Sequence, residues 1–332
     1  LLCQDAPCTK VCKTGDPARA IRAIRFNNEK NAWRWTEGCN DDDLERAEQA
    51  CIHYDKPLRI REMLHSVSCD SVATDKSFPS LAITFCGIPC ENPFFLASSA
   101  ICTNYEMVAR AFEMGWAGVF YKTICKQPIN EVSPRFDAVK EGTSFIGFRN
   151  MEQLSENPYD VDFDILHRLK QDYPSKVVIA SIMGQSEEDW IELAKMAENA
   201  GCDAVELNFS CPQMRESGMG SDVGQDPELV TFFTAYVKHN VKIPVIPKMT
   251  PNIAHISLPA MGAYFAGADA ISAINTIKSV TLGEGSEVNG CHTGSGYSGK
   301  AIKPLALRHI LALVKNPMMK KIQYSGIGGI ET

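Results

Sequence analysis

The chain has 332 residues, of which 45% are hydrophobic and 22% charged, and its formal net charge is −7. A globular protein of this size can hold one large domain and a smaller one. Because the chain is acidic and has no basic stripe, nucleic acid and anionic membranes are poor candidates as partners. We find no apolar run long enough to span a bilayer and no signal peptide, so we expect a cytoplasmic protein whose 13 cysteines are reduced, metal-bound or catalytic.

Residues 1–75 differ from the rest of the chain because they combine helix signals with six cysteines, at positions 3, 8, 12, 39, 51 and 69. Asp16-Pro17 predicts a helix over residues 18–28, and the acidic run 41–43 predicts a second helix toward Cys51. The spacing Cys3-x4-Cys8-x3-Cys12 is similar to part of an iron–sulfur ligand run, although it contains no CxxC pair. Buried thiols between helices are the alternative interpretation. Residues 56–80 are expected to form a connector.

Strands and helices alternate regularly from residue 81 onward. Residues 81–85 and 89–92 suggest a small hairpin, and Asn104, Ser186 and Asp226 are expected to cap helices. The predicted main strands cover residues 94–97, 117–121, 177–181, 204–207, 244–248, 268–273 and 322–325. Seven such strands favour an α/β fold, a (β/α)8 TIM barrel over residues 76–332 whose eighth strand is not in this chain. A doubly wound sheet is the alternative.

Two further segments have the sequence features of loops. Residues 124–150 are predicted to form a long irregular segment, and such length in a compact domain indicates a function. The Gly/Ser-rich residues 295–300 are predicted either to cover a cofactor or to form a solvated linker.

Chemically useful side chains follow the predicted strands, and in parallel α/β proteins ligands bind at this edge. The residues in these positions are Ser98, Ser99, Lys122, Thr123, Asn208, Ser210, Cys211, Lys248, Asn275 and Thr276. The lysines suit an electron-rich cofactor with a phosphate. Residues 326–329 are Gly-Ile-Gly-Gly and can bind phosphate through backbone N–H groups, although glycines also serve ordinary turns. Since no dinucleotide fingerprint is present, we predict a mononucleotide such as a flavin.

The loop Asn208-Phe209-Ser210-Cys211-Pro212 resembles the N-x-S-C-P loop of flavin mononucleotide enzymes in the dihydroorotate and dihydropyrimidine dehydrogenase group. Further motifs resemble the dihydropyrimidine dehydrogenase family in particular, above all the flavin-barrel subunit of its bacterial NAD-dependent form. These motifs are Asn-Glu-Val-Ser-Pro-Arg at 130–135, Ile-Gly-Phe-Arg-Asn-Met-Glu at 146–152, Gly-Gln-Asp-Pro-Glu-Leu at 224–229, Lys-Met-Thr-Pro-Asn at 248–252 and Ser-Gly-Lys-Ala-Ile-Lys-Pro at 298–304. The resemblance covers residues 81–332.

The resemblance implies a role for each matching residue. It implies that Cys211 is the general acid, whereas a buried cysteine in a turn is the plainer interpretation of the same residue. The residues implied in pyrimidine binding are Asn150, Glu152, Asn208, Ser210, Asn275 and Thr276. The residues implied around FMN are Ser98, Ser99, Lys122, Thr123, Lys248, Gly299, Gly328 and Gly329. The residues implied as iron–sulfur ligands of the first segment are Cys3, Cys8, Cys12 and Cys51.

The implied reaction is the reduction of uracil or thymine to the 5,6-dihydro form. Because the sequence has no recognisable nicotinamide site, electrons are expected to come from NAD(H) or NADP(H) through an FAD-binding partner subunit or domain, within an oligomer. Dihydroorotate dehydrogenase is the alternative, and Glu152 disfavours it because a carboxylate there would repel the ring carboxylate of orotate. A non-catalytic iron–sulfur electron-transfer subunit is an alternative of another class.

Overall fold

The computed structural model describes residues 6–25, 28–52, 57–66, 80–127, 136–141, 144–151, 154–210, 221–280, 287–288, 291–292 and 295–330. The chain divides into two compact units, residues 1–79 and 80–332. None of the helices in these ranges is long and apolar enough to cross a membrane.

The first unit is helical in its described part, as the sequence predicts. Its helices are α1 (Pro7–Lys10), α2 (Pro17–Arg25), α3 (Glu29–Thr36), α4 (Asp41–Gln49) and α5 (Ile60–His65). The side chain of Asn40 caps α4 by accepting a hydrogen bond from the backbone N–H of Asp43. The unit has its own apolar core, which includes Ile21, Leu44 and Ile60. Helix α5 lies inside the segment predicted as a connector, so that prediction is wrong for residues 60–65.

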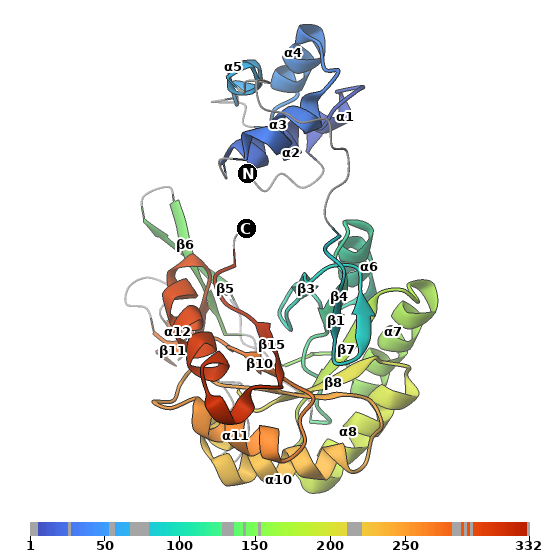
Figure 1. Ribbon diagram of the computed structural model, residues 1–332, viewed down its shortest axis with the longest axis vertical. Coiled ribbons are helices and arrows are strands. Elements are labelled where there is room, and N and C mark those ends of the chain that lie inside the picture. The colour runs from blue at the N-terminus through green and yellow to red at the C-terminus, as the bar shows by residue number, and fades with distance from the viewer. Residues whose placement is uncertain are drawn as a thin grey trace. The chain divides into compact units, whose positions relative to one another are not determined.

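The second unit is built on a curved parallel sheet (Figure 1). Within the described residues, seven strands pair in the order β15-β10-β9-β8-β7-β4-β3. Their bounds are β3 Phe95–Leu96, β4 Gly118–Phe120, β7 Val177–Ile182, β8 Ala204–Asn208, β9 Val245–Lys248, β10 Ala270–Ala273 and β15 Gln323–Gly326. Every neighbouring pair is parallel. The predicted barrel-type fold and its strands are therefore confirmed, with ends that shift by one or two residues.

Helices cover the outer face of this sheet (Figure 1). The main ones are α6 (Tyr105–Glu113), α7 (Tyr159–Asp172), α8 (Glu187–Asn199), α10 (Pro227–Lys238), α11 (Ser257–Phe265) and α12 (Lys303–Val314). Shorter helices are α9 (Ser221–Gln225), η1 (Lys300–Ile302) and η2 (Pro317–Met319). As predicted, Asn104, Ser186 and Asp226 accept hydrogen bonds from the first turns of α6, α8 and α10.

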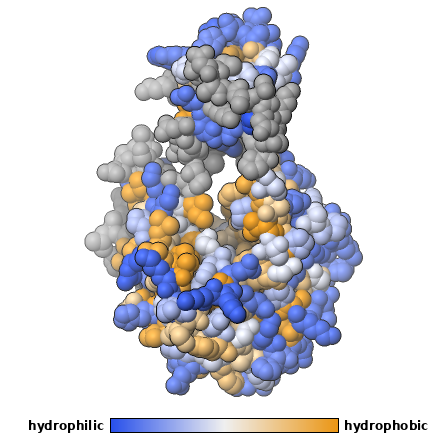
Figure 2. Space-filling view, viewed as in Figure 1, coloured by the Kyte–Doolittle hydropathy of each residue, from blue (hydrophilic) through white to orange (hydrophobic). Residues whose placement is uncertain are grey.

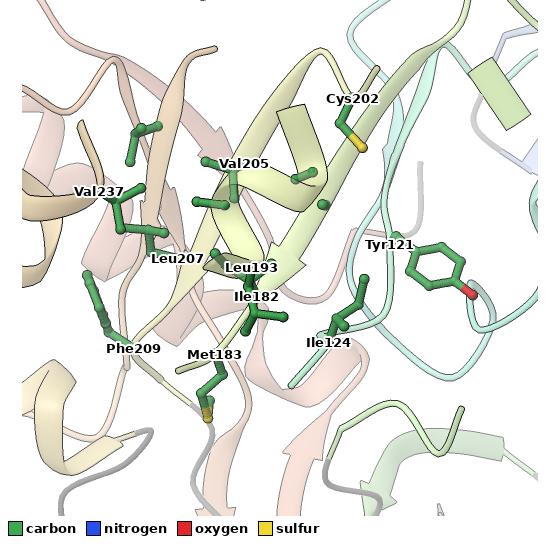
Figure 3. Close-up of a cluster of buried hydrophobic side chains, with 14 of the residues drawn as sticks. Tyr121, Ile124, Ile182, Met183, Leu193, Cys202, Val205, Leu207, Phe209 and Val237 are labelled. Carbon is green, nitrogen blue, oxygen red and sulfur yellow. The ribbon is translucent and has the colours of Figure 1, made fainter. Parts of the chain in front are cut away.

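Both faces of the central strands β4, β7, β8, β9 and β10 are buried, which explains why these strands read as apolar runs. On the outer face, Val205 and Leu207 of β8 pack with Leu193 and Val237 of the covering helices (Figure 3). On the inner face, Phe120, Ile179, Ala204 and Ile246 form an apolar layer with the hairpin residues Phe85 and Cys90. This hairpin, β1 (Ile83–Phe85) and β2 (Ile88–Cys90), was predicted from the sequence. The inner layer closes one end of the barrel interior.

Two predicted loops are strands in the structure. Within residues 124–150, β5 (Phe136–Glu141) pairs with β6 (Ser144–Asn150), and β6 also pairs with β14 (Ser295–Ser298), beyond which lies β11 (Ile277–Ser279). A further short pair is β12 (Glu287–Val288) with β13 (Cys291–His292). The irregular and loop predictions are wrong for these residues. The pairing of β6 with β14 joins residues about 150 positions apart, which local sequence patterns do not reveal.

Candidate active site

A cavity of about 310 Å³ opens at the carboxyl ends of the barrel strands. The residues that line it and were selected from the sequence are Ser98, Ser99, Lys122, Thr123, Asn150, Asn208, Lys248, Asn275, Thr276 and Gly328. Others were not selected: Ala97, Ala100, Ile101, Phe148, Ile274, Ser298, Ile302 and Ile327. The sheet of β6 and β14 contributes Phe148, Asn150 and Ser298, so the strand pairing missed by the sequence analysis delivers one wall of the cavity.

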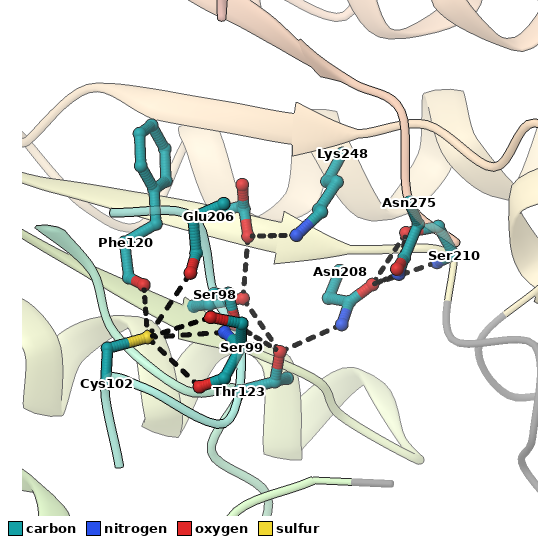
Figure 4. Close-up of polar contacts among 12 residues, drawn as sticks. Ser98, Ser99, Cys102, Phe120, Thr123, Glu206, Asn208, Ser210, Lys248 and Asn275 are labelled. Atoms are coloured by element: carbon teal, nitrogen blue, oxygen red, sulfur yellow. Dashed lines mark hydrogen bonds and ion pairs between the residues drawn. The ribbon is translucent and has the colours of Figure 1, made fainter. Parts of the chain in front are cut away.

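Side-chain amides meet near the floor of this cavity (Figure 4). The Nδ2 of Asn208 donates to Thr123 Oγ1 at 2.9 Å, and its Oδ1 accepts from Ser210 Oγ at 2.7 Å. Asn275 Nδ2 donates to Ser210 Oγ at 2.8 Å, while Asn275 Oδ1 accepts from the backbone N–H of Thr276, also at 2.8 Å. Ser210 is fully buried and does not line the cavity. It acts between the two asparagines, whose orientations are therefore fixed before a ligand binds.

Two lysines bring positive charge to the cavity wall. Lys122 is 4% exposed and Lys248 is 3% exposed, and they come from the ends of different strands. Lys248 Nζ lies 3.5 Å from Glu206 Oε1, and Glu206 is fully buried. A buried ammonium needs such a partner because desolvation of an unpaired charge is costly.

A chain of hydroxyl groups connects this ion pair to the amides (Figure 4). Ser181 Oγ donates to Glu206 Oε1 at 2.8 Å and lies 3.0 Å from Thr123 Oγ1. Thr123 Oγ1 is also 3.2 Å from Ser98 Oγ. The sequence analysis did not select Glu206 or Ser181. The available signal was a charged residue within the apolar strand 204–207, where burial makes a carboxylate unusual.

The loop after β3 is held by Cys102, another residue that the sequence analysis did not select. Its thiol contacts the carbonyls of Ala97 and Phe120, both at 3.3 Å, and accepts from the backbone N–H of Ser99 at 3.2 Å (Figure 4). Burial raises the pKa of Cys102 despite the opposing charges of Lys122 and Lys248. The group is therefore a protonated thiol that supports the loop of Ser98 and Ser99.

Glycines shape the end of the cavity beside α12. Gly328 lines the cavity at φ +123°, and a Cβ there would lie 2.9 Å from Ala306 Cβ. Gly329, at φ +69°, does not line this cavity, and a Cβ on it would lie 2.8 Å from the backbone of Lys303, where α12 begins. Gly299 also lies outside the lining, at φ +99°. Gly328 leaves the cavity wall beside the start of α12 without a side chain, which suits the close approach of a phosphate, and together with the two lysines it fits a mononucleotide.

Two residues selected from the sequence, Cys211 and Glu152, lie outside the described residues. Their neighbours Ser210 and Met151 are both buried at the described ends of these segments. Asn150 lines the cavity two positions before Glu152.

The described cysteines of the first unit lie in two pairs. Cys8 and Cys51 line one small cavity of about 20 Å³, and the sulfurs of Cys12 and Cys39 are 3.2 Å apart. Burial, followed by the interaction with Cys12, raises the pKa of Cys39 to about 12. No group of three or more metal-binding side chains occurs among the described residues, and Cys3 lies outside them. The described thiols alone therefore do not complete an iron–sulfur site.

Comparison with known proteins decides the family. Residues 80–332 match the family model of dihydroorotate dehydrogenase. The chain belongs to this family. Within it, the chain is 52% identical over 259 residues to the NAD-dependent dihydropyrimidine dehydrogenase subunit PreA of Escherichia coli (strain K12), which confirms the resemblance seen in the sequence. That match covers 76% of this chain and 63% of the relative, so the chain spans less than two thirds of the length of PreA.

Two further relatives have lower sequence identity to this chain. The chain is 37% identical over 276 residues to the chloroplastic dihydropyrimidine dehydrogenase (NADP(+)) of Arabidopsis thaliana, covering 77% of this chain and 65% of that protein. It is 35% identical over 254 residues to the catalytic subunit of dihydroorotate dehydrogenase B (NAD(+)) of Pyrococcus furiosus, covering 76% and 80%. A crystal structure of DHODH from Eimeria tenella with ferulenol has a TM-score of 0.63 at 18% identity, over 79% of this chain and 76% of that one. This structural match supports the fold.

Proposed function

We propose that this chain is a flavin-dependent catalytic unit that reduces uracil or thymine to the 5,6-dihydropyrimidine. The observation that carries the proposal is the meeting of Asn150, Asn208 and Asn275 at one cavity that also contains two buried lysines. A pyrimidine ring presents alternating N–H donors and C=O acceptors, and side-chain amides can match both. The 52% identity to a dihydropyrimidine dehydrogenase subunit supports the same substrate class.

FMN, when bound, would supply the hydride for one carbon of the 5,6 double bond. The residues proposed to hold it are Ser98, Ser99, Lys122, Thr123, Lys248, Gly299, Gly328 and Gly329. The lysines would neutralise negative charge on the cofactor, and the glycine loop would approach its phosphate.

Cys211 is proposed as the general acid. It directly follows Ser210 in the chain, and Ser210 forms hydrogen bonds with the side chains of both Asn208 and Asn275. Its thiol would donate a proton to the ring carbon next to the one that receives the hydride, and solvent would then reprotonate the thiolate. The overall reaction balances as NAD(P)H, a proton and the pyrimidine giving NAD(P)+ and the dihydropyrimidine. Pyrimidine contacts are proposed for Asn150, Glu152, Asn208, Asn275 and Thr276.

The electrons are proposed to come from NADH or NADPH through an FAD-binding partner subunit or domain. The first unit would contribute an iron–sulfur site to this route, with Cys3, Cys8, Cys12 and Cys51 as the proposed ligands. Iron and sulfide analysis of protein prepared without oxygen tests this part of the proposal. Iron that is lost in Cys8→Ser and kept in Cys86→Ser supports it, and protein without iron contradicts it.

Substrate comparison tests the catalytic proposal. Protein reconstituted with FMN is supplied with an artificial electron donor, and the turnover of uracil, thymine and orotate is measured in parallel. We expect uracil or thymine to be reduced and orotate to react poorly, because Glu152 would repel its carboxylate. Faster turnover of orotate than of uracil would instead favour dihydroorotate dehydrogenase. No turnover of any of the three would favour an electron-transfer subunit.

A further inference from the structure

Glu206 is a buried acid that the proposed reaction does not use. It lies on β8 and is fully buried, one layer inside the barrel from the cavity residues Asn208 and Lys248. We propose that Glu206 is a positioning residue for Lys248, which it holds in place and whose positive charge it partly offsets beside the flavin. This inference rests on the proposed binding of FMN in the cavity.

The strand register fixes this placement. Ser181, Glu206 and Ile246 occupy one row of neighbouring strands, and Asn208, Lys248 and Ser272 occupy the next row toward the cavity. Ile246 belongs to the apolar layer that closes the barrel interior. The carboxylate of Glu206 therefore has apolar residues on one side and the ammonium of Lys248, 3.5 Å away, on the other.

The contacts of Glu206 differ from those of an acid retained for stability. A structural carboxylate in a protein interior normally has hydrogen bonds to both oxygens. In Glu206, Oε1 accepts from Ser181 and faces Lys248, whereas Oε2 has no hydrogen-bond partner among the described residues. Well-packed apolar residues in place of a buried ion pair are often as stable or more stable. The pair is thus better explained by its effect on the cavity than by its effect on folding.

The same carboxylate is also connected to the substrate side of the cavity. From Glu206, hydrogen bonds lead through Ser181 and Thr123 to the amide of Asn208 (Figure 4). The group that sets the charge at Lys248 therefore also limits how the pyrimidine-binding amide can move. The cofactor and substrate sides of the cavity are therefore joined by one hydrogen-bonded network.

The expected effect follows from charge. Reduction adds negative charge to a flavin, so a nearby cation favours the reduced state and a nearby anion disfavours it. Glu206→Gln keeps an acceptor for Lys248 and Ser181 but removes the anion. The midpoint potential of the bound flavin should then rise, and the reduced flavin should become a weaker hydride donor to the pyrimidine.

The test compares three variants with the wild type. Ser272→Ala is the matched control, because Ser272 is buried in register with Lys248 and its hydroxyl has no partner among the described residues. For Glu206→Gln we expect a raised midpoint potential and turnover about tenfold lower. This is the lower end of the loss found when a residue that supports a metal ligand is replaced, and Glu206 supports Lys248 in the same way. The KM for uracil should change less than about twofold, because the contacts of Asn208 are kept. Ser272→Ala should match the wild type in all three quantities.

Two further measurements keep the proposal falsifiable. FMN titration and thermal unfolding of the apoprotein show whether each variant folds and binds the cofactor. Glu206→Asp withdraws the carboxylate from Lys248 by one methylene group, and its potential should lie between those of the wild type and Glu206→Gln. An unchanged or lowered potential in Glu206→Gln, or a wild-type potential in Glu206→Asp, overturns the proposal. If the variants show the expected potential shifts but the wild type does not reduce uracil, only the proposed substrate is refuted. A wild type that does not bind FMN refutes both proposals.

Discussion

Asn208, which lines the cavity, is held at both ends of its side-chain amide by hydrogen bonds. Thr123 accepts from its nitrogen, and Ser210 donates to its oxygen. Asn208 is 5% exposed, so neither bond competes strongly with bulk water. The amide therefore presents a set orientation to a ligand, and Thr123 is the residue that sets it from the side of β4.

Thr123→Val tests this orientation. Valine has the shape of threonine but leaves Asn208 Nδ2 without its buried acceptor, a loss of about 1–3 kcal/mol. We expect the KM for uracil to rise by about tenfold or more, with a smaller change in kcat. Thr234→Val is the control, since Thr234 is buried and its hydroxyl has no partner among the described residues. Equal kinetics for the two variants would show that Thr123 does not orient the amide.

Cys211→Ala tests the proton donor. Loss of a general acid typically lowers the rate by about 10²–10⁴-fold, and we expect that loss with FMN binding unchanged. Steady-state reduction of uracil and the flavin absorbance of the same preparation measure both quantities. Cys86→Ala, at the half-buried turn of the β1–β2 hairpin, should keep full activity. Turnover close to that of the wild type in Cys211→Ala would remove the thiol from the mechanism.

The sequence identified cavity residues where a polar or charged side chain lies at or just after the end of a predicted strand. Lys122, Lys248 and Asn275 were found in this way, and all three line the cavity. Glu206 was missed because it lies inside its strand, and strand-end position gives no information about interior layers. Phe148 was missed because its strand pairs with residues about 150 positions away in the chain. Burial and long-range pairing are properties of the folded chain, so they became visible only in the structure.

At the scale of elements, α12 connects the glycine loop to the outer layer of the barrel. Its first residue, Lys303, lies against Gly329, and Ala306 lies against Gly328. His309, farther along the same helix, is 5% exposed. Burial, followed by the charge of Arg308, lowers the pKa of His309. The stability of this helix should therefore depend on pH.

The sign of the dependence follows from proton linkage. A histidine with a lowered folded-state pKa takes up a proton more readily in the unfolded chain, so its stabilising effect is present above about pH 6.5 and is lost as the pH falls. We expect the melting temperature to fall between about pH 7.5 and 5.5, and to fall less in His309→Gln. Differential scanning calorimetry of both proteins measures the difference. His255→Gln, at an exposed position, should keep the wild-type slope, and an equal slope in His309→Gln would contradict the assignment.

The main elements were predictable because their signals are local. Apolar runs marked the parallel strands, and Asn104, Ser186 and Asp226 marked the starts of helices with a side-chain acceptor. Strands β5, β6 and β14 were not predictable in this way. Ser295–Ser298 is rich in serine and glycine, and it is a strand only because β6 and β11 pair with its two edges.

At the scale of the whole barrel unit, the main sheet ends at β3 and β15 within the described residues. A cavity of about 430 Å³ is lined by residues of both strands, together with Phe94, Trp116 and Ile330. Phe94 is 50% exposed and Ile330 is 67% exposed. Figure 2 shows hydrophobic surface around β3 on this side of the unit. Sheet edges beside apolar surface favour association with another strand.

Association of this 332-residue chain should therefore depend on its concentration and on Phe94. Phe94→Glu places a charge at the sheet edge and should shift sedimentation velocity profiles toward the monomer. Phe265→Glu is the control, because Phe265 is 64% exposed on α11 and does not line the cavity between β3 and β15. A larger effect of the control, or a wild type that stays monomeric at all concentrations, would contradict this prediction.

The central claim is that the barrel unit itself reduces a neutral pyrimidine, and a single-turnover measurement tests it most directly. Protein with bound FMN is chemically reduced without oxygen, separated from excess reductant and mixed with uracil, thymine or orotate. The account predicts that uracil or thymine reoxidises the flavin and yields a stoichiometric amount of the 5,6-dihydropyrimidine, measured by mass spectrometry. Orotate should leave the flavin reduced. Reoxidation by orotate alone, or reoxidation by uracil without dihydrouracil, would contradict the account.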